Sequence, residues 1–292
     1  MSDISTNRYR DLQRLARANN QPADQLMTLY ALEGFLARLM MTQHSKTFVL
    51  KGGMLLAAFA QRRPTKDIDV QALEFDNDVG HVLEVVTDIL AVNLHDGLVF
   101  DLHSVVVTQI RDADAYSGLR VAVETALATA RLKMRLDINV GDPITPAPTL
   151  INVPRLLDDA PITMLGYPLT MVFAEKTMTA VERGVANTRW RDFADILLLS
   201  RAHDVDGDEL IHAVSTVARH RGVAIRTLTD VLDGFADQAQ DRWWRWVRKF
   251  QLDDRLPERF SEIIESVQAF ADPVLSGDAS GKRWISAKKL WI

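Results

Sequence analysis

The feature that most constrains the fold is a change in residue pattern at a proline-rich segment, residues 143–154. Before this segment, short apolar runs predict strands interspersed with helices, whereas after it nearly every apolar pattern has helical spacing. A chain divided in this way indicates two domains with different secondary structure. We therefore expect an α/β (α+β) domain with a mixed β-sheet over residues 1–150 and an all-helical domain over residues 151–292.

Composition is typical of a globular protein. Of the 292 residues, 47% are hydrophobic and 25% are charged. The absence of cysteine excludes disulfides, thiolate zinc sites and cysteine nucleophiles, and fits a reducing cytoplasm. The polar start predicts no signal peptide and the apolar run 54–60 is too short to cross a bilayer, so we expect a cytoplasmic protein with no membrane partner. A formal net charge of −5 means that nucleic-acid binding would require a local basic patch.

Asp67 and Asp69 form the sharpest candidate site. They fall in a short predicted strand, where residues two apart share a face while Ile68 and Val70 point into the core. Two adjacent carboxylates repel each other, and a divalent cation such as Mg²⁺ would remove that repulsion. An Asp-x-Asp pair is also common in exposed turns, so context is needed to interpret it.

Gly52 and Gly53 supply part of that context, since they lie between a predicted strand and a predicted helix, residues 47–50 and 54–62. Glycine lets the backbone approach a phosphate closely, and the start of a helix favours an anion. An ordinary turn would also explain the pair. Lys51 is a further candidate substrate-binding residue, although solvation is the simpler explanation for it.

Asp137 is a third candidate metal ligand. It lies on the polar face of a predicted strand, residues 131–140, in which every second residue is apolar. Two-metal phosphoryl or nucleotidyl transfer uses such a third acid, because one ion activates the attacking hydroxyl and the other holds the triphosphate. The alternative is a solvated sheet face on which Asp137 forms salt bridges with neighbouring charges such as Lys133 and Arg135.

Two predicted helices of the second domain carry further candidates. Lys176 lies in the helix over residues 171–186, and a lysine is a mobile charge suited to a phosphate. Arg189 and Asp192 lie at the start of the next helix and are candidate substrate-binding and catalytic residues. Asp195 shares a helical face with Asp192, but acids near a helix start are explained by the helix dipole, which is our interpretation for Asp195.

The order of these motifs resembles the AbiEii/MenT nucleotidyltransferase toxins, a family of the DNA-polymerase-β-like superfamily that includes the mycobacterial MenT toxins. The matching blocks are Lys51-Gly52-Gly53, Thr65-Lys66-Asp67-Ile68-Asp69, Leu136-Asp137-Ile138-Asn139-Val140-Gly141-Asp142, Ala174-Glu175-Lys176 and Arg189-Trp190-Arg191-Asp192-Phe193-Ala194-Asp195. The resemblance covers residues 45–200, and the order of the blocks is more specific than any one block. Gly-Gly replaces the Gly-Ser of the wider superfamily, and beyond His203 no residue is matched.

The resemblance implies a bilobed toxin that transfers nucleotides from a nucleoside triphosphate (NTP) to the 3′ end of tRNA, blocking aminoacylation and translation, and that has a cognate antitoxin. It also implies residue roles. Gly52, Gly53 and Thr65 would border the triphosphate; Asp67 and Asp69 would bind one or two Mg²⁺ ions; Lys176 would hold phosphate; Asp192 would complete the active site from the second lobe.

Three other functions are compatible with the residues. The acceptor could be a protein or a small molecule. The chain could instead be a non-catalytic nucleotide-binding regulatory module, in which the carboxylates are structural. A metal-dependent nuclease would also use clustered acids, but it would have no need of Gly52, Gly53 or Lys176.

A tRNA acceptor requires basic surface, and the predicted helix 241–251 is one candidate for it. Its basic and aromatic residues could clamp a backbone and stack bases: Arg242, Arg245, Arg248 and Lys249 with Trp243, Trp244 and Trp246. The interpretation we favour is packing, in which Trp243, Trp246 or Val247, and Phe250 form one buried stripe. Trp244 does not fit that stripe. The tail adds Lys282, Arg283, Lys288 and Lys289.

Overall fold

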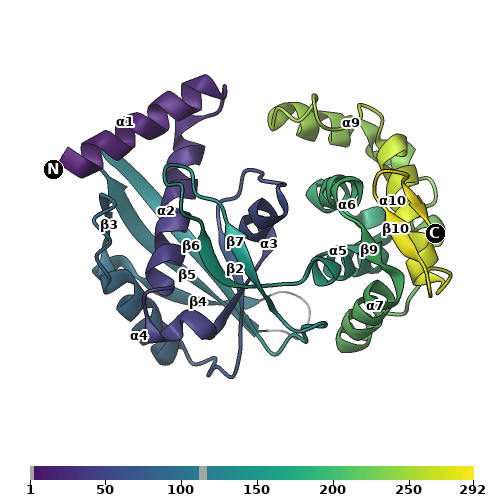
Figure 1. The fold of residues 1–292 in the computed structure, drawn as a ribbon, viewed down its shortest axis with the longest axis horizontal. Coiled ribbons are helices and arrows are strands. Elements are labelled where there is room, and N and C mark those ends of the chain that lie inside the picture. Colours follow the sequence, from purple (N-terminus) through teal and green to yellow (C-terminus); the bar gives the residue numbers. More distant parts are fainter. Residues whose placement is uncertain (1–2, 112–116) are drawn as a thin grey trace. The chain divides into compact units, whose positions relative to one another are not determined.

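A computed structural model describes residues 3–111 and 117–292 of the chain. The chain forms two compact units, one of residues 1–142 with 148–167 and one of residues 143–147 with 168–292. The first unit combines a mixed sheet with helices, and the second is mainly helical (Figure 1). The expected α/β (α+β) class, with a mixed sheet followed by a helical region, is confirmed.

The first unit is built on an eight-stranded sheet in the order β3-β5-β6-β2-β1-β8-β7, with β4 also pairing with β5. The strands are β1 (Phe48–Lys51), β2 (Ile68–Ala72), β3 (Leu98–Phe100), β4 (Val106–Arg111), β5 (Ser117–Leu127), β6 (Ala130–Val140), β7 (Thr149–Val153) and β8 (Ile162–Gly166). β2 pairs in parallel with β6 and antiparallel with β1, so the centre of the sheet is mixed. The alternation expected in β6 is present, since Met134, Leu136 and Ile138 are buried.

β7 and β8 were not predicted from the sequence. They follow the proline-rich segment, where the chain was expected to become helical, but β8 pairs in parallel with β1 and β7 pairs antiparallel with β8. The first unit therefore continues beyond residue 150 to Tyr167. A five-residue strand at the side of a sheet carries too few residues for its period to be distinguished from a loop.

Helices cover the sheet of the first unit: α1 (Asp3–Ala18), α2 (Ala23–Leu39), α3 (Gly52–Leu55) and α4 (Val79–Ala91). α2 lies across one face of the sheet (Figure 1). Its five leucines, whose near-helical spacing predicts this helix, are all buried: Leu26, Leu29, Leu32, Leu36 and Leu39. α1 contributes Leu12 and Ala16 to a core cluster with Tyr30 of α2 and Leu127 of β5.

Two expected elements of this unit differ from the structure. The helix predicted over residues 54–62 begins at Gly52, continues in a 3₁₀ turn η2 (Leu56–Phe59), and ends where Ala60 adopts a left-handed conformation (φ 59°). The residue pattern over 98–109 predicts one strand, whereas the structure has two, β3 and β4, separated by the 3₁₀ turn η3 (Leu102–Ser104), which Asp101 caps. A further 3₁₀ turn, η1 (Gln43–Lys46), precedes β1.

The second unit packs its helices around an aromatic core. They are α5 (Leu169–Arg183), α6 (Trp190–Ala202), α7 (Gly207–Arg221), α8 (Leu228–Val231), α9 (Phe235–Lys249) and α10 (Phe260–Leu275), with the 3₁₀ turn η4 (Gly184–Ala186) after α5. Phe260 contacts Trp190, Phe193, Phe235 and Trp243, with ring centroids 5.0–5.7 Å apart. The residue pattern predicts a helix break near residue 240, but α9 begins earlier, directly after its N-cap residue Gly234 (φ 69°).

The C-terminal tail forms strands, an addition to the all-helical region that was expected. β10 (Arg283–Ile285) pairs with β11 (Leu290–Trp291) and with β9 (Val205–Asp206). Trp284 Nε1 donates to the carbonyl of Ser200 at 2.6 Å, and Trp291 Nε1 donates to that of Phe270 at 2.9 Å. The tryptophans of the tail therefore pack against the helices. Within the described ranges, no helix combines the length and apolar character needed to span a membrane.

Candidate active site

Asp67 and Asp69 lie at the start of β2, the strand between β1 and β6. Ile68 and Val70 are buried, whereas both carboxylate residues are partly exposed, as their alternation predicts. The strand register places Asp69 beside Lys51 of β1 on one side and beside Asp137 of β6 on the other. Paired residues of adjacent strands point to the same face, so the sheet brings these charged groups together.

The Gly52–Gly53 pair directly follows β1 and lies against the carboxylate strand. Gly52 has a φ of +66°, and a Cβ atom on it would be 1.9 Å from Asp69 Oδ2. A Cβ atom on Gly53 would be 2.6 Å from Thr65 Oγ1. Glycine is therefore required at position 52 both by conformation and by the carboxylate beside it. The proximity of this turn to Asp69 is the context that the Asp-x-Asp pair lacked in the sequence.

Thr65, in the segment that precedes β2, contacts Asp67. Its Oγ1 lies 3.1 Å from Asp67 Oδ1 and 3.2 Å from the Asp67 carbonyl oxygen. The hydroxyl thus joins Asp67 to the glycine turn, since Gly53 also lies against Thr65.

Asp137 is engaged by a residue that the sequence analysis did not identify. Arg120 of β5 donates from Nε to Oδ1 at 2.8 Å and from Nη2 to Oδ2 at 2.6 Å. The hydrogen bond and charge of Asp137 raise the pKa of Arg120 above its ordinary value, and the carboxylates of Asp67 and Asp69 add to the rise despite partial burial. The structure therefore places the buried Asp137 in an ion pair with the exposed Arg120, and Lys133 and Arg135 remain exposed on the strand.

Lys51 is not solvated, contrary to the simpler explanation given above. Its Nζ donates to Asp142 Oδ2 at 3.0 Å and lies 5.4 Å from the centre of the Tyr167 ring. Its side chain is 14% exposed. Asn139 also donates to Asp142 Oδ2, at 3.3 Å, so Asp142 accepts hydrogen bonds from both Lys51 and Asn139 at this edge of the site. Lys51 adds a positive charge beside Asp69 in the register of the sheet.

The described residues contain no group of three or more His, Cys, Asp or Glu side chains arranged to hold a metal ion. The first unit instead offers two partly exposed aspartates, with the third acid paired to an arginine. Magnesium is commonly held by one or two carboxylates with water and substrate phosphates completing the shell. The donor set of Asp67 and Asp69 fits that arrangement.

The second unit contains a separate charged cluster centred on Lys176 of α5. Its Nζ donates to Asp192 Oδ1 at 2.8 Å and to Asp195 Oδ2 at 2.7 Å, and Arg189 Nε lies 3.1 Å from Asp192 Oδ2. Asp195 is 3% exposed and sits in the second turn of α6, so its assignment to the helix dipole is wrong: it is a buried partner of Lys176.

Asp192 remains ionised in this cluster. Burial alone would raise its pKa, but the charges of Lys176 and Arg189 and the hydrogen bond from Lys176 outweigh burial and lower the pKa below the ordinary value. The Lys176 ammonium is consequently fixed between two carboxylates on successive turns of α6.

One family of proteins matches the chain over most of its length. The sequence profile described as "Nucleotidyl transferase AbiEii toxin, Type IV TA system" matches residues 34–273, most of the chain. The chain belongs to the AbiEii family. It is therefore a member of the nucleotidyltransferase toxins of type IV toxin–antitoxin systems.

Two solved structures from Helicobacter pylori are similar to the AbiEii chain. One, of a candidate nucleotidyltransferase, is 15% identical with a TM-score of 0.48, covering 87% of this chain and 95% of the other. The second, of JHP933, is 13% identical with a TM-score of 0.47, covering 95% of this chain and 94% of the other. No curated protein matches the sequence.

The aromatic helix of this AbiEii protein, α9, packs as the favoured interpretation predicted. Trp243 and Val247 are fully buried, and Trp243 Nε1 donates to the carbonyl of Pro257 at 3.0 Å. Trp246 and Phe250 are partly buried at the edge of the same stripe. Trp244 lies outside it, with the guanidinium of Arg248 5.3 Å from its ring centre. The basic residues of α9 form an exposed face.

Proposed function

We propose that this AbiEii protein transfers a nucleotide from an NTP to the 3′ end of tRNA in a Mg²⁺-dependent reaction, and so blocks aminoacylation and translation in the cytoplasm. The observation that supports the proposal most is the contact of Asp69 with Gly52, where the carboxylate lies directly against a turn that only glycine can form. A metal-binding carboxylate beside an open backbone segment is what a metal–triphosphate substrate requires.

Asp67 and Asp69 are the residues that would hold Mg²⁺, and Asp137 is a third candidate. The ion would supply charge neutralisation for the triphosphate and activation of the acceptor hydroxyl. The chain itself positions the ligands. The Thr65 hydroxyl orients Asp67, and the Gly52 turn fixes the position of Asp69. Arg120 neutralises Asp137 by donating to both of its oxygens.

The remaining residues would bind the donor. Gly52 and Gly53 would border the triphosphate, with Thr65 and Lys51 at the same edge of the sheet. In the transfer, the acceptor 3′ oxygen forms a bond to the α-phosphorus, the bond from that phosphorus to the bridging oxygen breaks, and pyrophosphate leaves.

We further propose that the second unit contributes Lys176, Asp192 and Arg189 to this reaction. Lysine is a point charge suited to a phosphate, and the two carboxylates that accept from Lys176 would set where its ammonium lies. Arg189, 40% exposed beside Asp192, would be a second phosphate contact. The toxin–antitoxin family implies a cognate antitoxin that restrains the activity.

The test is transfer of label from each α-labelled NTP in turn, with Mg²⁺ and total tRNA. We expect label at the tRNA 3′ end. Asp69→Asn should reduce it at least about a hundredfold, since even the outer-shell partners of metal ligands are worth 10–100-fold. The matched control is Asp76→Asn, an exposed aspartate of the following loop, which should retain activity within about twofold of wild type.

Other outcomes identify the competing functions. Label recovered in protein or in a small molecule would identify that molecule, and not tRNA, as the acceptor. Shortening of the RNA in a reaction that Asp69→Asn abolishes would indicate a nuclease. Absence of any label, together with unchanged thermal stability on addition of Mg²⁺ and NTP to folded protein, would leave a non-catalytic role, because a bound ligand must stabilise the native state.

A further inference from the structure

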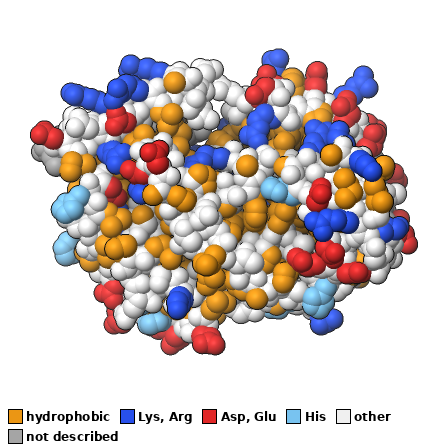
Figure 2. Space-filling view, in the orientation of Figure 1, with side chains coloured by type: hydrophobic (Ala, Val, Ile, Leu, Met, Phe, Trp, Pro, Cys, Tyr) orange, Lys and Arg blue, Asp and Glu red, His pale blue; other side chains and the backbone are white. Residues whose placement is uncertain are grey.

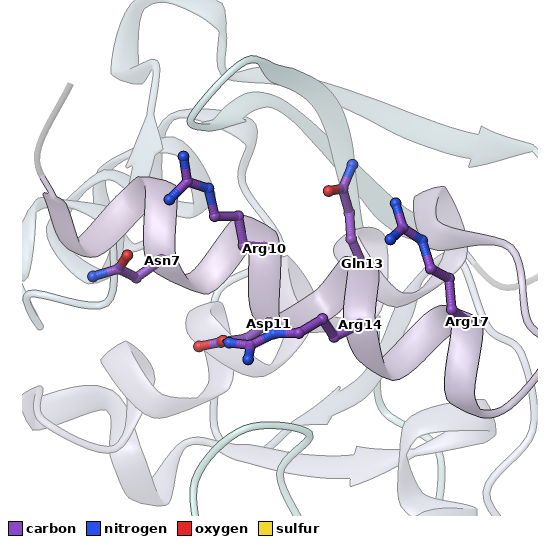
Figure 3. Close-up of a pocket in the computed structure, with 6 residues that line it drawn as sticks. All are labelled: Asn7, Arg10, Asp11, Gln13, Arg14 and Arg17. Carbon is purple, nitrogen blue, oxygen red and sulfur yellow. The ribbon is translucent and has the colours of Figure 1, made fainter.

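The exposed side of α1 carries a set of basic residues that the site described above does not use. An open hollow of the surface is lined by Asn7, Arg10, Asp11, Gln13, Arg14 and Arg17, all of them on α1 (Figure 3). Arg10, Arg14 and Arg17 are exposed, at helical spacings of four and three residues. Basic side chains gather over α1 in the surface view, at its upper left (Figure 2).

Arg10 and Arg17 are available for a ligand, and Arg14 would exchange its partner Asp11 for a phosphate. The fourth arginine of the helix, Arg8, is used within the fold, since it donates to Asp158 Oδ1 at 2.7 Å. Arg14 forms an ion pair with Asp11 on the same helix, whereas within residues 3–111 and 117–292 Arg10 and Arg17 have no ion-pair or hydrogen-bond partner. The close-up shows Arg10, Gln13 and Arg17 extending from one side of the helix and Arg14 turned toward Asp11 (Figure 3).

We propose that this face of α1, Arg10, Arg14 and Arg17 with Asn7 and Gln13, binds the phosphate backbone of the acceptor RNA. The inference rests on the proposed function, for which it names a binding surface. Arg10 and Arg17 are seven residues apart, about 10 Å along the helix axis. This length is enough to contact several successive phosphates of one strand. Asn7 and Gln13 add amide donors of the kind that contact phosphate oxygens.

The basic charge of this face is opposite in sign to the net charge of the whole protein. The whole protein carries a formal charge of −5, whereas the six residues that line the hollow comprise three arginines and one aspartate. An acidic protein that binds RNA needs a local surface of this sign.

A membrane surface would be the other common partner of a basic amphipathic helix. Such binding requires the apolar side of the helix to enter the lipid. In α1 that side is occupied, because Leu12 and Ala16 are buried in the core with Met27, Tyr30 and Leu127. The face that carries Arg10, Arg14 and Arg17 is polar and basic, which favours a backbone of phosphates over a bilayer.

The experiment measures binding of a fluorescein-labelled tRNA transcript to the full-length protein by anisotropy, without NTP, between 50 and 200 mM salt. Removing three phosphate contacts should make the slope of log K against log [salt] shallower by about 2 to 2.7. The affinity of the wild-type protein would then fall about 20- to 40-fold more over this range than that of Arg10→Gln/Arg14→Gln/Arg17→Gln.

The matched control is Arg201→Gln/Arg219→Gln/Arg226→Gln, which removes the same charge from three exposed positions of the second unit. Its slope should remain within experimental error of wild type. An equal change in both triple variants, no change in the α1 variant, or no salt-dependent RNA binding by wild type would each overturn the proposal. Circular dichroism would show that both variants are folded.

The two proposals fail differently. If RNA binding depends on α1 but label from the NTP enters protein or a small molecule, the proposed acceptor is wrong and the binding surface stands. If label enters the tRNA 3′ end and the α1 variant binds RNA like wild type, the acceptor stands and this surface is wrong.

Discussion

Arg120 of β5 donates two hydrogen bonds to Asp137 of β6, 2.8 and 2.6 Å long, one to each carboxylate oxygen. The two residues are directly paired across the strands, and Asp137 is in turn paired with Asp69 across the next strand boundary. A permanent positive charge therefore lies at the side of the carboxylates that we propose bind metal. This charge neutralises the carboxylate of Asp137.

Replacement of Arg120 should change metal affinity. In Arg120→Gln, the acidic cluster loses its fixed cation and Asp137 loses its bidentate partner, so a divalent cation should bind about tenfold more tightly, or ~1.4 kcal/mol. Titration with Mn²⁺, monitored by electron paramagnetic resonance, measures this metal affinity without an activity assay. Arg131→Gln, an exposed arginine at the opposite end of β6, is the matched control and should leave affinity unchanged. Weaker binding by Arg120→Gln would mean that Arg120 positions Asp137 for the metal.

Substitution at Gly52 should disturb Asp69 specifically. In Gly52→Ala the new Cβ would be 1.9 Å from Asp69 Oδ2, in addition to the strain of a φ of +66°. Gly222 at the end of α7 has a φ of +65° and nothing within 4 Å of a Cβ atom, so Gly222→Ala isolates the strain alone, about 1–2 kcal/mol.

We expect both alanine variants to lose thermal stability, but only Gly52→Ala to lose the rise in melting temperature on addition of Mg²⁺ and NTP. Equal ligand responses in the two variants would contradict the proposed role of the glycine turn.

Removal of Lys176 should destabilise the second unit. Lys176→Met leaves Asp192 and Asp195 buried without their ammonium partner, a change that typically costs about 3–5 kcal/mol. Adding Asp195→Asn should recover part of the loss, because one buried charge is removed. Urea unfolding of the wild type, both single variants and the double variant gives the coupling energy. Additive effects would show that the observed ion pair does not contribute to stability.

The same cluster should make stability dependent on pH in the acid range. The pKa of Asp192 lies below its ordinary value of 3.8, so the unfolded chain takes up a proton before the folded one as pH falls. The stability contributed by ionised Asp192 is complete above about pH 5 and is lost as the pH falls below 3.8. Urea unfolding from pH 6 to 3 should show a smaller acid decrease for Asp192→Asn than for wild type. Asp241→Asn, an exposed aspartate of α9, should behave like wild type.

Sequence periodicity was sufficient to predict the elements with a long, regular pattern. β6 alternates over its whole length and α2 is apolar on nearly every side, so their burial could be predicted without a structure. The orientation of Asp67 and Asp69 followed from the same period of two. The short strands β7 and β8 have no such length, and their place in the sheet depends on a parallel pairing with β1 that no local pattern encodes.

The partners of the candidate residues were harder to predict than the residues themselves. Arg120 lies on a strand in which Leu119, Val121 and Val123 alternate with outward residues, so its face was predictable. That it would meet Asp137 required the register of the β5–β6 hairpin. Asp195 could have been recognised as a partner of Lys176, since it lies three residues from Asp192 on one face of α6. Because acids near the start of a helix are usually explained by the helix dipole, the sequence alone did not indicate that Asp195 pairs with Lys176.

The return of the chain to the first sheet has a consequence for synthesis on the ribosome. β1 carries the glycine turn at its end, yet its parallel neighbour β8 is more than a hundred residues later in the chain. Until residue 166 has left the exit tunnel, β1 therefore has one unpaired edge, and the segment that positions Asp69 is only half supported. A nascent chain would thus complete the support of the Asp69 segment only after β8 has been made, when α5 and Lys176 are about to follow.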